Sequence, residues 1–359
     1  EASLRSQVLI TTGGLGPTPD DITTETIASL FNTELIFNEE VWENIKRKFI
    51  SRNHLADNNK KQALLPEGAM IIPNQLGTAP GIIWTPKKDF TIITFPGVPS
   101  EMEHMWLKTV KPWLQKSYPS EYIFTSKNMN FTGITESSLV EKIPDLLAKN
   151  NPTVAPYASL GKVKLRITSK AKNIKEGNDL ITPVKSELHK RLGAYFYSNE
   201  DESLAYIVID LLRKRNENIS IAESCTGGSL GAALTSIPGA SDVFLGGVIA
   251  YQNEVKTNVL NVPNDLIEKH GAVSGPVAKS MALGTKTLFN SNWSIAISGI
   301  AGPTGGNVKK PIGLVEIAVI GPNSQESIKE QFAPHRERTE IQKLSVLRAL
   351  DRLRLLLLS

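Results

Sequence analysis

Apolar runs alternate with helix-like segments along the chain, and the character of this alternation changes twice. Between residues 8 and 116, the runs at Val8–Thr12 and Phe90–Phe95 predict buried strands, and each is followed by a loop rich in glycine and proline. From about residue 120 to 198, YIFTSKNMNF and KVKLRITSKA alternate like half-exposed strands. These patterns predict an α/β layer followed by a small α+β module.

A third unit begins near Glu202, where LAYIVIDLLRKR has the apolar spacing of a helix. Strands are expected at ISIAE, GVIAY, WSIAISG and IGLVEIAVI, with helices over residues 277–289 and from residue 336 onward. Strands that alternate with helices favour another α/β sheet. We therefore predict three domains, at residues 1–118, 119–200 and 201–359.

Composition narrows the classes of function. Of 359 residues, 40% are hydrophobic and 21% are charged, an ordinary globular balance. The net charge of +4 fits an anionic small molecule at least as well as nucleic acid, and no basic run stands out. The single cysteine, Cys225, excludes an internal disulfide and a multi-cysteine zinc site. The chain has no secretory signal pattern, and no apolar run approaches the length of roughly 20 residues that a membrane span needs. We therefore expect a cytoplasmic protein without membrane contact.

The segment IAESCTGGSLGAAL carries the first candidate chemistry. Ser224 follows a predicted strand and precedes Gly227 and Gly228, so it is expected near a helix N-terminus whose N–H groups can hold a phosphate or an oxyanion. Alternatively, Ser224 or Thr226 caps that helix. Cys225 is a rival nucleophile because a thiol at a helix start can be activated, but it also fits a buried small residue.

Three further segments follow. In VIAYQNEVKTNVL, Lys256 can act as a base if burial or a nearby charge lowers its pKa; otherwise it is a solvated charge. SGIAGPTGG follows a strand and predicts either an anion-binding loop or a plain turn. KHGAVS contributes His270 and Ser274, and His270 fits packing better than catalysis. Because loops after neighbouring strands of an α/β sheet gather at one edge, we expect these segments to form one site.

In their order and spacing, AESCTGG, YQNEVK, HGAVS and SGIAGPTGG resemble the CinA family, competence/damage-inducible protein A. The resemblance implies a C-terminal amidase that hydrolyses nicotinamide mononucleotide to nicotinic acid mononucleotide and ammonia. It makes Ser224 the nucleophile, Lys256 the base and Tyr251 a proton relay, with no cofactor for the amidase and a homodimer as the assembly. The substrate contacts expected on this basis are Glu223, Cys225, Thr226, Gly227, Gly228, Asn253, Ser298, Gly299, Ala301, Gly302, Gly305 and Gly306.

TTGGLGPTPDDIT and FPGVPSEM resemble the molybdopterin-binding-like domain of the same family. Some members cleave ADP-ribose there with a divalent cation, which makes Asp20 and Asp21 candidates for a metal or phosphate site. Alternatively, one of them caps the helix expected near Ile22. The family's domain opens with a strand and helix ahead of this loop, whereas the chain begins just upstream of the loop. We therefore expect an incomplete domain without pyrophosphatase activity.

The middle segment, with GITESSLVEKI, resembles the family's KH-like module. KH domains bind nucleic acid through a GxxG loop, and none occurs between residues 120 and 198, so no nucleic-acid partner is expected. The alternatives to an amidase are an ADP-ribose pyrophosphatase and a nucleotide-binding module with a role in competence. A pure binding module would not need Ser224, Tyr251 and Lys256 together.

Overall fold

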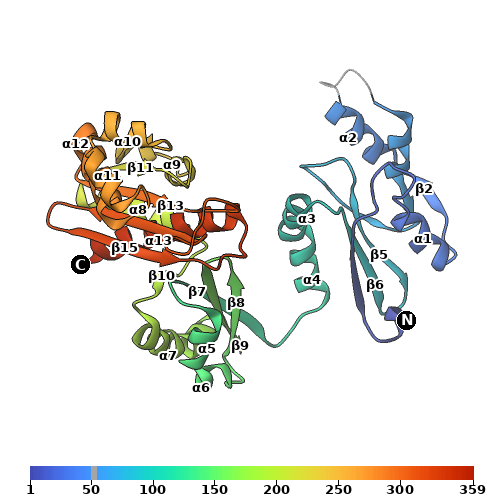
Figure 1. Cartoon of the computed structure of the whole chain (residues 1–359). Coiled ribbons are helices and arrows are strands. Elements are labelled where there is room, and N and C mark those ends of the chain that lie inside the picture. Colours follow the sequence, from blue (N-terminus) through green and yellow to red (C-terminus); the bar gives the residue numbers. More distant parts are fainter. Residues whose placement is uncertain (50–54) are drawn as a thin grey trace. The chain divides into compact units, whose positions relative to one another are not determined.

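The computed structural model describes residues 1–49 and 55–359 (Figure 1). The chain forms two compact units, Glu1–Glu121 and Tyr122–Ser359. Within the described ranges, every helix is too short or too polar to cross a lipid bilayer.

The first unit is built on a four-stranded sheet of order β1-β6-β5-β4. Its two apolar runs form neighbouring parallel strands, with Val8 opposite Thr91. All of β6 is buried because helices cover both faces, which explains why its sequence, FTIITF, contains no charged residue. The strands are β1 (Val8–Thr12), β4 (Met70–Ile72), β5 (Gly81–Lys87) and β6 (Phe90–Phe95), beside a small sheet of β2 (Leu35–Phe37) and β3 (Leu64–Pro66). The helices are α1 (Thr23–Leu30), α2 (Glu39–Phe49), α3 (Pro99–Met105) and α4 (Lys111–Ser117), with helical turns at Ala2–Leu4, Asp57–Ala63 and Trp106–Val110.

The second unit opens with a four-stranded antiparallel sheet of order β10-β7-β9-β8. Its strands are β7 (Ile123–Thr132), β8 (Thr153–Ser159), β9 (Lys162–Ala171) and β10 (Phe196–Ser198), and its helices are α5 (Glu136–Glu141), α6 (Pro144–Leu147) and α7 (Ile174–Leu192). Apolar residues of the strands pack with all three helices in one core, on one face of the sheet. The predicted period-two alternation of β9 is confirmed, since Val163, Leu165 and Ile167 are buried.

The remainder of the second unit is a five-stranded sheet of order β12-β11-β13-β14-β15. Strands β11, β12 and β13 run parallel, and β14 and β15 continue the sheet antiparallel. The strands are β11 (Ile219–Glu223), β12 (Phe244–Ile249), β13 (Trp293–Gly299), β14 (Leu314–Ile320) and β15 (Gln325–Gln331). The helices are α8 (Leu204–Arg215), α9 (Ser229–Thr235), α10 (Asn253–Leu260), α11 (Asn264–His270), α12 (Gly275–Phe289) and α13 (Arg338–Leu358), with a 3-10 turn at Ala240–Asp242.

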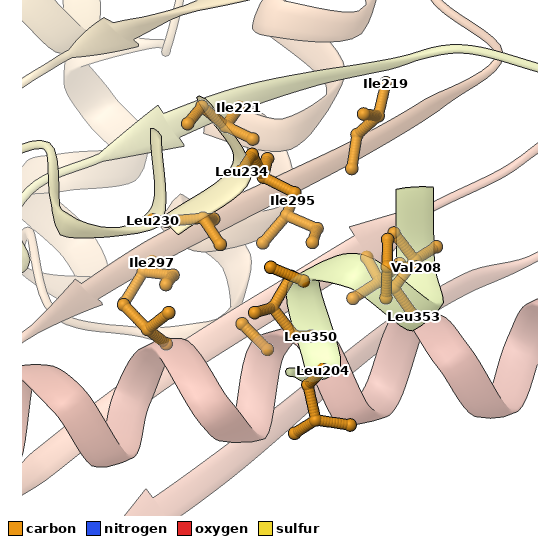
Figure 2. Close-up of a cluster of buried hydrophobic side chains, with 14 of the residues drawn as sticks. Leu204, Val208, Ile219, Ile221, Leu230, Leu234, Ile295, Ile297, Leu350 and Leu353 are labelled. Carbon is orange, nitrogen blue, oxygen red and sulfur yellow. The ribbon is translucent and has the colours of Figure 1, made fainter. Parts of the chain in front are cut away.

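Helices cover both faces of this sheet. On one face, Ile221 and Ile297 point toward Leu204 of α8 and Leu350 of α13, as Figure 2 shows. On the other face, Ala222, Ala296 and Ala318 lie beneath α12, with α10 and α11 packed beside it. Full burial of each large apolar side chain stabilises the fold by about 1.5–3 kcal/mol. The sheet is therefore a rigid frame for the loops that leave its strands.

The predicted fold class is confirmed: an α/β domain, a small α+β module and a second α/β domain. Seven of the described strands lie outside the predictions: β2, β3, β4, β5, β8, β10 and β15. β15 is an edge strand of sequence QESIKEQ, and half-exposed edge positions carry few of the apolar residues on which strand prediction depends. The strand expected over GVIAY ends at Ile249, which leaves Ala250 and Tyr251 in the following loop.

Candidate active site

The carboxyl ends of three neighbouring parallel strands carry the candidate residues. Ser224 directly follows β11, Tyr251 follows β12 by two residues, and the glycine-rich loop follows β13. Since β11 lies between β12 and β13, the three loops leave the same edge of the sheet. The predicted convergence of these segments is confirmed.

Lys256 is the best-defined member of the site. It lies on the first turns of α10, and the residue is only 1% exposed. Its Nζ lies 2.7 Å from the Ala250 carbonyl oxygen, 3.2 Å from that of Tyr251 and 3.4 Å from Ser224 Oγ. The lysine expected from the sequence is therefore a buried partner of the serine rather than a solvated charge.

Burial lowers the pKa of the Lys256 amine below its usual value, although Cys225 and Glu254 oppose that shift. A neutral amine has two N–H groups and one lone pair. The Gln252 carbonyl oxygen also lies 3.5 Å from Nζ. When the neutral amine donates its two N–H groups to the carbonyls of Ala250 and Tyr251, its two closest partners, its lone pair is left for the Ser224 hydroxyl. This arrangement allows Lys256 to accept the proton of Ser224.

The Glu223 side chain occupies the start of α9. Its carboxylate accepts hydrogen bonds from the backbone N–H groups of Gly228, Leu230 and Gly231, at 2.8 to 3.1 Å. The N–H groups at the start of α9 therefore already have an anionic partner within the protein, and neither the Ser224 nor the Thr226 side chain caps the helix. The expected substrate contacts at Glu223 and at the Gly228 amide are not supported, because each is used within the protein.

Two backbone amides beside the serine remain free to donate. The Ser224 N–H binds the Ile297 carbonyl, and the Gly227 N–H binds the Ser224 carbonyl. Within the described part of the chain, the amides of Cys225 and Thr226 bind no protein acceptor. An amide directly after a nucleophile is a common oxyanion donor, so the N–H groups of Cys225 and Thr226 are the candidates for that role.

Cys225 itself is buried, and burial raises the pKa of its thiol to about 12. A thiol with that pKa holds almost no thiolate at neutral pH, and the thiolate is the reactive form. Its carbonyl accepts a hydrogen bond from the Gln342 side chain at 2.8 Å. These contacts make Cys225 a packing residue beside Ser224.

Arg338, at the start of α13, is a site residue that sequence reasoning missed. Its guanidinium donates to the Tyr251 hydroxyl at 3.1 Å and to the Gly302 carbonyl at 2.8 Å. It forms no salt bridge within the described ranges, so its charge is available to an anionic ligand. The residue lies 87 positions from Tyr251 in a charged segment, RERTE, and no local pattern distinguishes it from a surface arginine.

Three family profiles together match nearly the whole chain. They are the probable molybdopterin binding domain at residues 1–116, the damage-inducible protein CinA KH domain at 126–198 and the CinA C-terminal domain at 201–357. A CinA-like protein of Prochlorococcus marinus is 63% identical over 358 residues, which is all of this chain and 85% of the relative. One of Parasynechococcus marenigrum is 52% identical over 86% of its length. The chain belongs to the CinA family.

Among solved structures, a competence/damage inducible protein from Agrobacterium tumefaciens is similar to 44% of this chain. The match covers 94% of that protein, with 36% sequence identity and a TM-score of 0.42. A CinA superfamily protein from Klebsiella pneumoniae is similar to 43% of the chain, covering 96% of that protein, with 33% identity and a TM-score of 0.42. The names of these proteins describe a family and state no reaction.

In this CinA-family chain, the segment from Ser298 to Gly306, which begins with the last two residues of β13, divides into a buried part and an exposed part. Ser298 is buried and donates to the Ala272 carbonyl, Gly299 packs against Cys225, and Ala301 belongs to the core. Gly302 and Gly305 have positive φ, a conformation that favours glycine. Gly302 is buried, whereas Gly305 and Gly306 are exposed, so of the expected contacts in this segment only Gly305 and Gly306 lie where a ligand could reach them.

Three other predicted residues surround the Ser224–Lys256 pair. Asn253 is the exposed first residue of α10. Thr226 is 1% exposed, and its Oγ1 has no hydrogen-bond partner within the described residues. The Tyr251 side chain is 55% exposed and contacts Arg338, while only its backbone carbonyl contacts Lys256. No hydrogen bond links the Tyr251 hydroxyl to that pair in the described part of the chain, so the expected relay is not supported by these contacts.

The loop at residues 270–274 is held in place by hydrogen bonds to its backbone. The Lys310 amine donates to the carbonyls of His270 and Val273 at 2.6 Å, and Ser274 donates to Gly271. The His270 contact is through its backbone, as expected for a packing role.

In the first unit, Asp20 and Asp21 both accept a hydrogen bond from the Thr18 hydroxyl. That bond lowers the pKa of the Asp21 carboxyl, and neither residue caps α1, whose N-cap is Ile22. Across residues 1–49 and 55–359, no three potential metal-ligating side chains gather. Among the described residues, Asp20 and Asp21 therefore have no third His, Cys, Asp or Glu side chain grouped with them.

Proposed function

We propose that the C-terminal part of this CinA-family protein hydrolyses the carboxamide of nicotinamide mononucleotide, releasing nicotinic acid mononucleotide and ammonia. The observation that carries the proposal is the buried Lys256, whose amine faces the Ser224 hydroxyl at the end of β11. The substrate class rests on the motifs shared with the family.

The first half of the reaction forms an acyl-enzyme. Lys256 takes the proton of Ser224 as Oγ attacks the carboxamide carbon. The amides of Cys225 and Thr226 stabilise the oxyanion that forms. Lys256 then gives this proton to the leaving nitrogen, the C–N bond breaks, and ammonia departs. In the second half, Lys256 takes a proton from water as the water oxygen attacks the ester carbon. Lys256 then returns this proton to Ser224 Oγ as the ester C–O bond breaks, and the acid that is released ionises to the carboxylate.

The phosphate of the substrate would lie on the opposite side of the site from the start of α9, where the Glu223 carboxylate repels it. Arg338 and the exposed amides near Gly305 and Gly306 supply positive character instead. Such a position also keeps the phosphate off the Lys256 amine, whose pKa a nearby anion would raise.

The proposal is tested by ammonia release from nicotinamide mononucleotide by the full chain. Ser224→Ala should abolish release, whereas Cys225→Ala should keep most of it, because the buried thiol plays no chemical part. An inactive Cys225→Ala protein that remains folded, together with an active Ser224→Ala protein, would show a thiol amidase and overturn the assignment.

A further inference from the structure

The antiparallel sheet of the middle module has one face that its helices do not cover. Helices α5, α6 and α7 pack in a single core with Met129, Leu165 and Ile167. Pairing in register places Phe124 opposite Lys170, Ser126 opposite Thr168 and Asn128 opposite Arg166 on the other face. Because side chains alternate along a strand, these residues project away from the helices. We call this surface, at Phe124, Ser126, Asn128, Tyr157, Arg166 and Lys170, the open face.

The charged side chains that β7, β8 and β9 contribute to this sheet surface are all positive. On its middle strand, β9, the residues facing outward include Lys162, Lys164, Arg166 and Lys170, and strands β7, β8 and β9 contain no acidic residue. Lys164 is paired with Asp201, and Lys162 lies near the Tyr197 ring. Arg166 and Lys170 are exposed and form no salt bridge with any described residue. The open face therefore presents two cations that no described carboxylate neutralises.

Aromatic rings flank these cations. Phe124 on β7 is 71% exposed and Tyr157 on β8 is 53% exposed. Each strand is a neighbour of β9, so the rings lie on either side of the basic strand. The Lys170 amine also lies 4.6 Å from the ring centroid of Tyr122. Exposed rings beside cations on a sheet are the combination that stacks bases while holding phosphates.

We propose that the open face binds single-stranded nucleic acid. Phosphates would contact Arg166 and Lys170, and bases would stack on Phe124 and Tyr157, with Asn128 available for hydrogen bonds. This mode does not use a GxxG loop, so the lack of that motif in the module is no objection. A duplex hides its bases from such rings, and two separated aromatic rings give an anionic membrane little apolar area to bury.

The test is fluorescence anisotropy of the full chain with labelled oligo(dT) and oligo(U) of about 12 nucleotides, the length range that one such platform occupies. Binding should weaken with salt, and Phe124→Ala should weaken it at least about fivefold, because it removes a stacking surface. Arg166→Glu/Lys170→Glu should weaken it more strongly and flatten the salt dependence. The two oligonucleotides distinguish DNA from RNA as the natural strand.

The matched control is Lys185→Glu/Lys190→Glu on α7, which changes the net charge equally on the helical side of the module. It should bind like the unchanged protein, and all variants should keep amidase activity if the fold is intact. Equal losses in both charge variants would overturn the proposal. So would equal affinity for a duplex of the same length, or binding to vesicles of anionic lipid without binding to either oligonucleotide.

Discussion

Lys256 shows how a single residue acquires a chemical role from its surroundings. In sequence it is one of 40 basic residues, in a segment that resembles any exposed helix start. In the fold it is among the largest fully buried side chains. A buried amine is easier to deprotonate than a solvated one, and its carbonyl partners fix its direction toward Ser224.

We expect the pH dependence of the amidase to report this shift. Because burial lowers the pKa of Lys256, the neutral base is lost as pH falls through that lowered value, and kcat/KM should rise with pH below the usual lysine pKa of about 10.4. Lys256→Arg should lose turnover at every pH, since a guanidinium does not deprotonate in a protein. Steady-state assays across pH measure both effects. Near-normal turnover in the Lys256→Arg variant would mean that another group is the base.

Arg338 should act on binding rather than on chemistry. We expect Arg338→Ala to raise KM for nicotinamide mononucleotide by roughly 10- to 100-fold with little change in kcat. A change of that size corresponds to the free energy of one lost charge-assisted hydrogen bond. Nicotinamide riboside, which lacks the phosphate, is the control substrate, and its KM should hardly change. A similar loss for both substrates would place Arg338 away from the phosphate, as a support for Tyr251.

At the scale of elements, strand β11 and helix α9 are joined by one side chain. Glu223 is 1% exposed, and its carboxylate satisfies three N–H groups of the turn and the helix start. Those donors would otherwise be unpaired at a buried helix end. The same contact fixes the path of the loop that carries Ser224.

Glu223→Gln should therefore destabilise the protein. The amide keeps one acceptor but turns an NH2 group toward backbone donors, which we expect to cost about 1–3 kcal/mol. Urea unfolding of this variant is compared with Glu268→Gln, a change at an exposed residue of α11 that should cost less than about 0.5 kcal/mol. Equal unfolding midpoints for the two variants would contradict this role.

At the scale of the whole molecule, the middle module and the C-terminal part share a core within Tyr122–Ser359. Tyr197 of β10 is 8% exposed and belongs to the core that α8 and α13 form on the large sheet. Arg354 of α13 is 3% exposed, pairs with Asp351 and donates to the Phe196 carbonyl. The C-terminal part therefore depends on residues that precede its family profile.

A fragment of residues 202–359 should consequently be less stable than residues 122–359. We expect a loss of about 2 kcal/mol from the missing Tyr197 side chain alone, measured by urea unfolding. A fragment starting at residue 194 restores β10 without the rest of the module and should recover part of the loss. Coincident unfolding curves for all three fragments would show that the shared core contributes nothing.

The sequence by itself determined the fold class and eight of the fifteen described strands, because apolar periodicity reflects burial directly. It also gave Ser224 and Lys256 as candidates through local motifs, and it placed their loops at one sheet edge, since parallel strands send their carboxyl ends the same way. The proposed reaction came from shared motifs and not from periodicity.

Only the tertiary structure decided which of these side chains are free to act. It assigned the Glu223 carboxylate to the start of α9 and buried the Cys225 thiol. It also paired the Tyr251 hydroxyl with Arg338, which lies 87 residues away in sequence, rather than with Ser224 or Lys256. It also gathered the cations of β9 on one face, where the sequence shows no basic run because alternate residues of a strand point to opposite sides. Charge and hydrogen-bond partners depend on distances in space, which local sequence patterns do not contain.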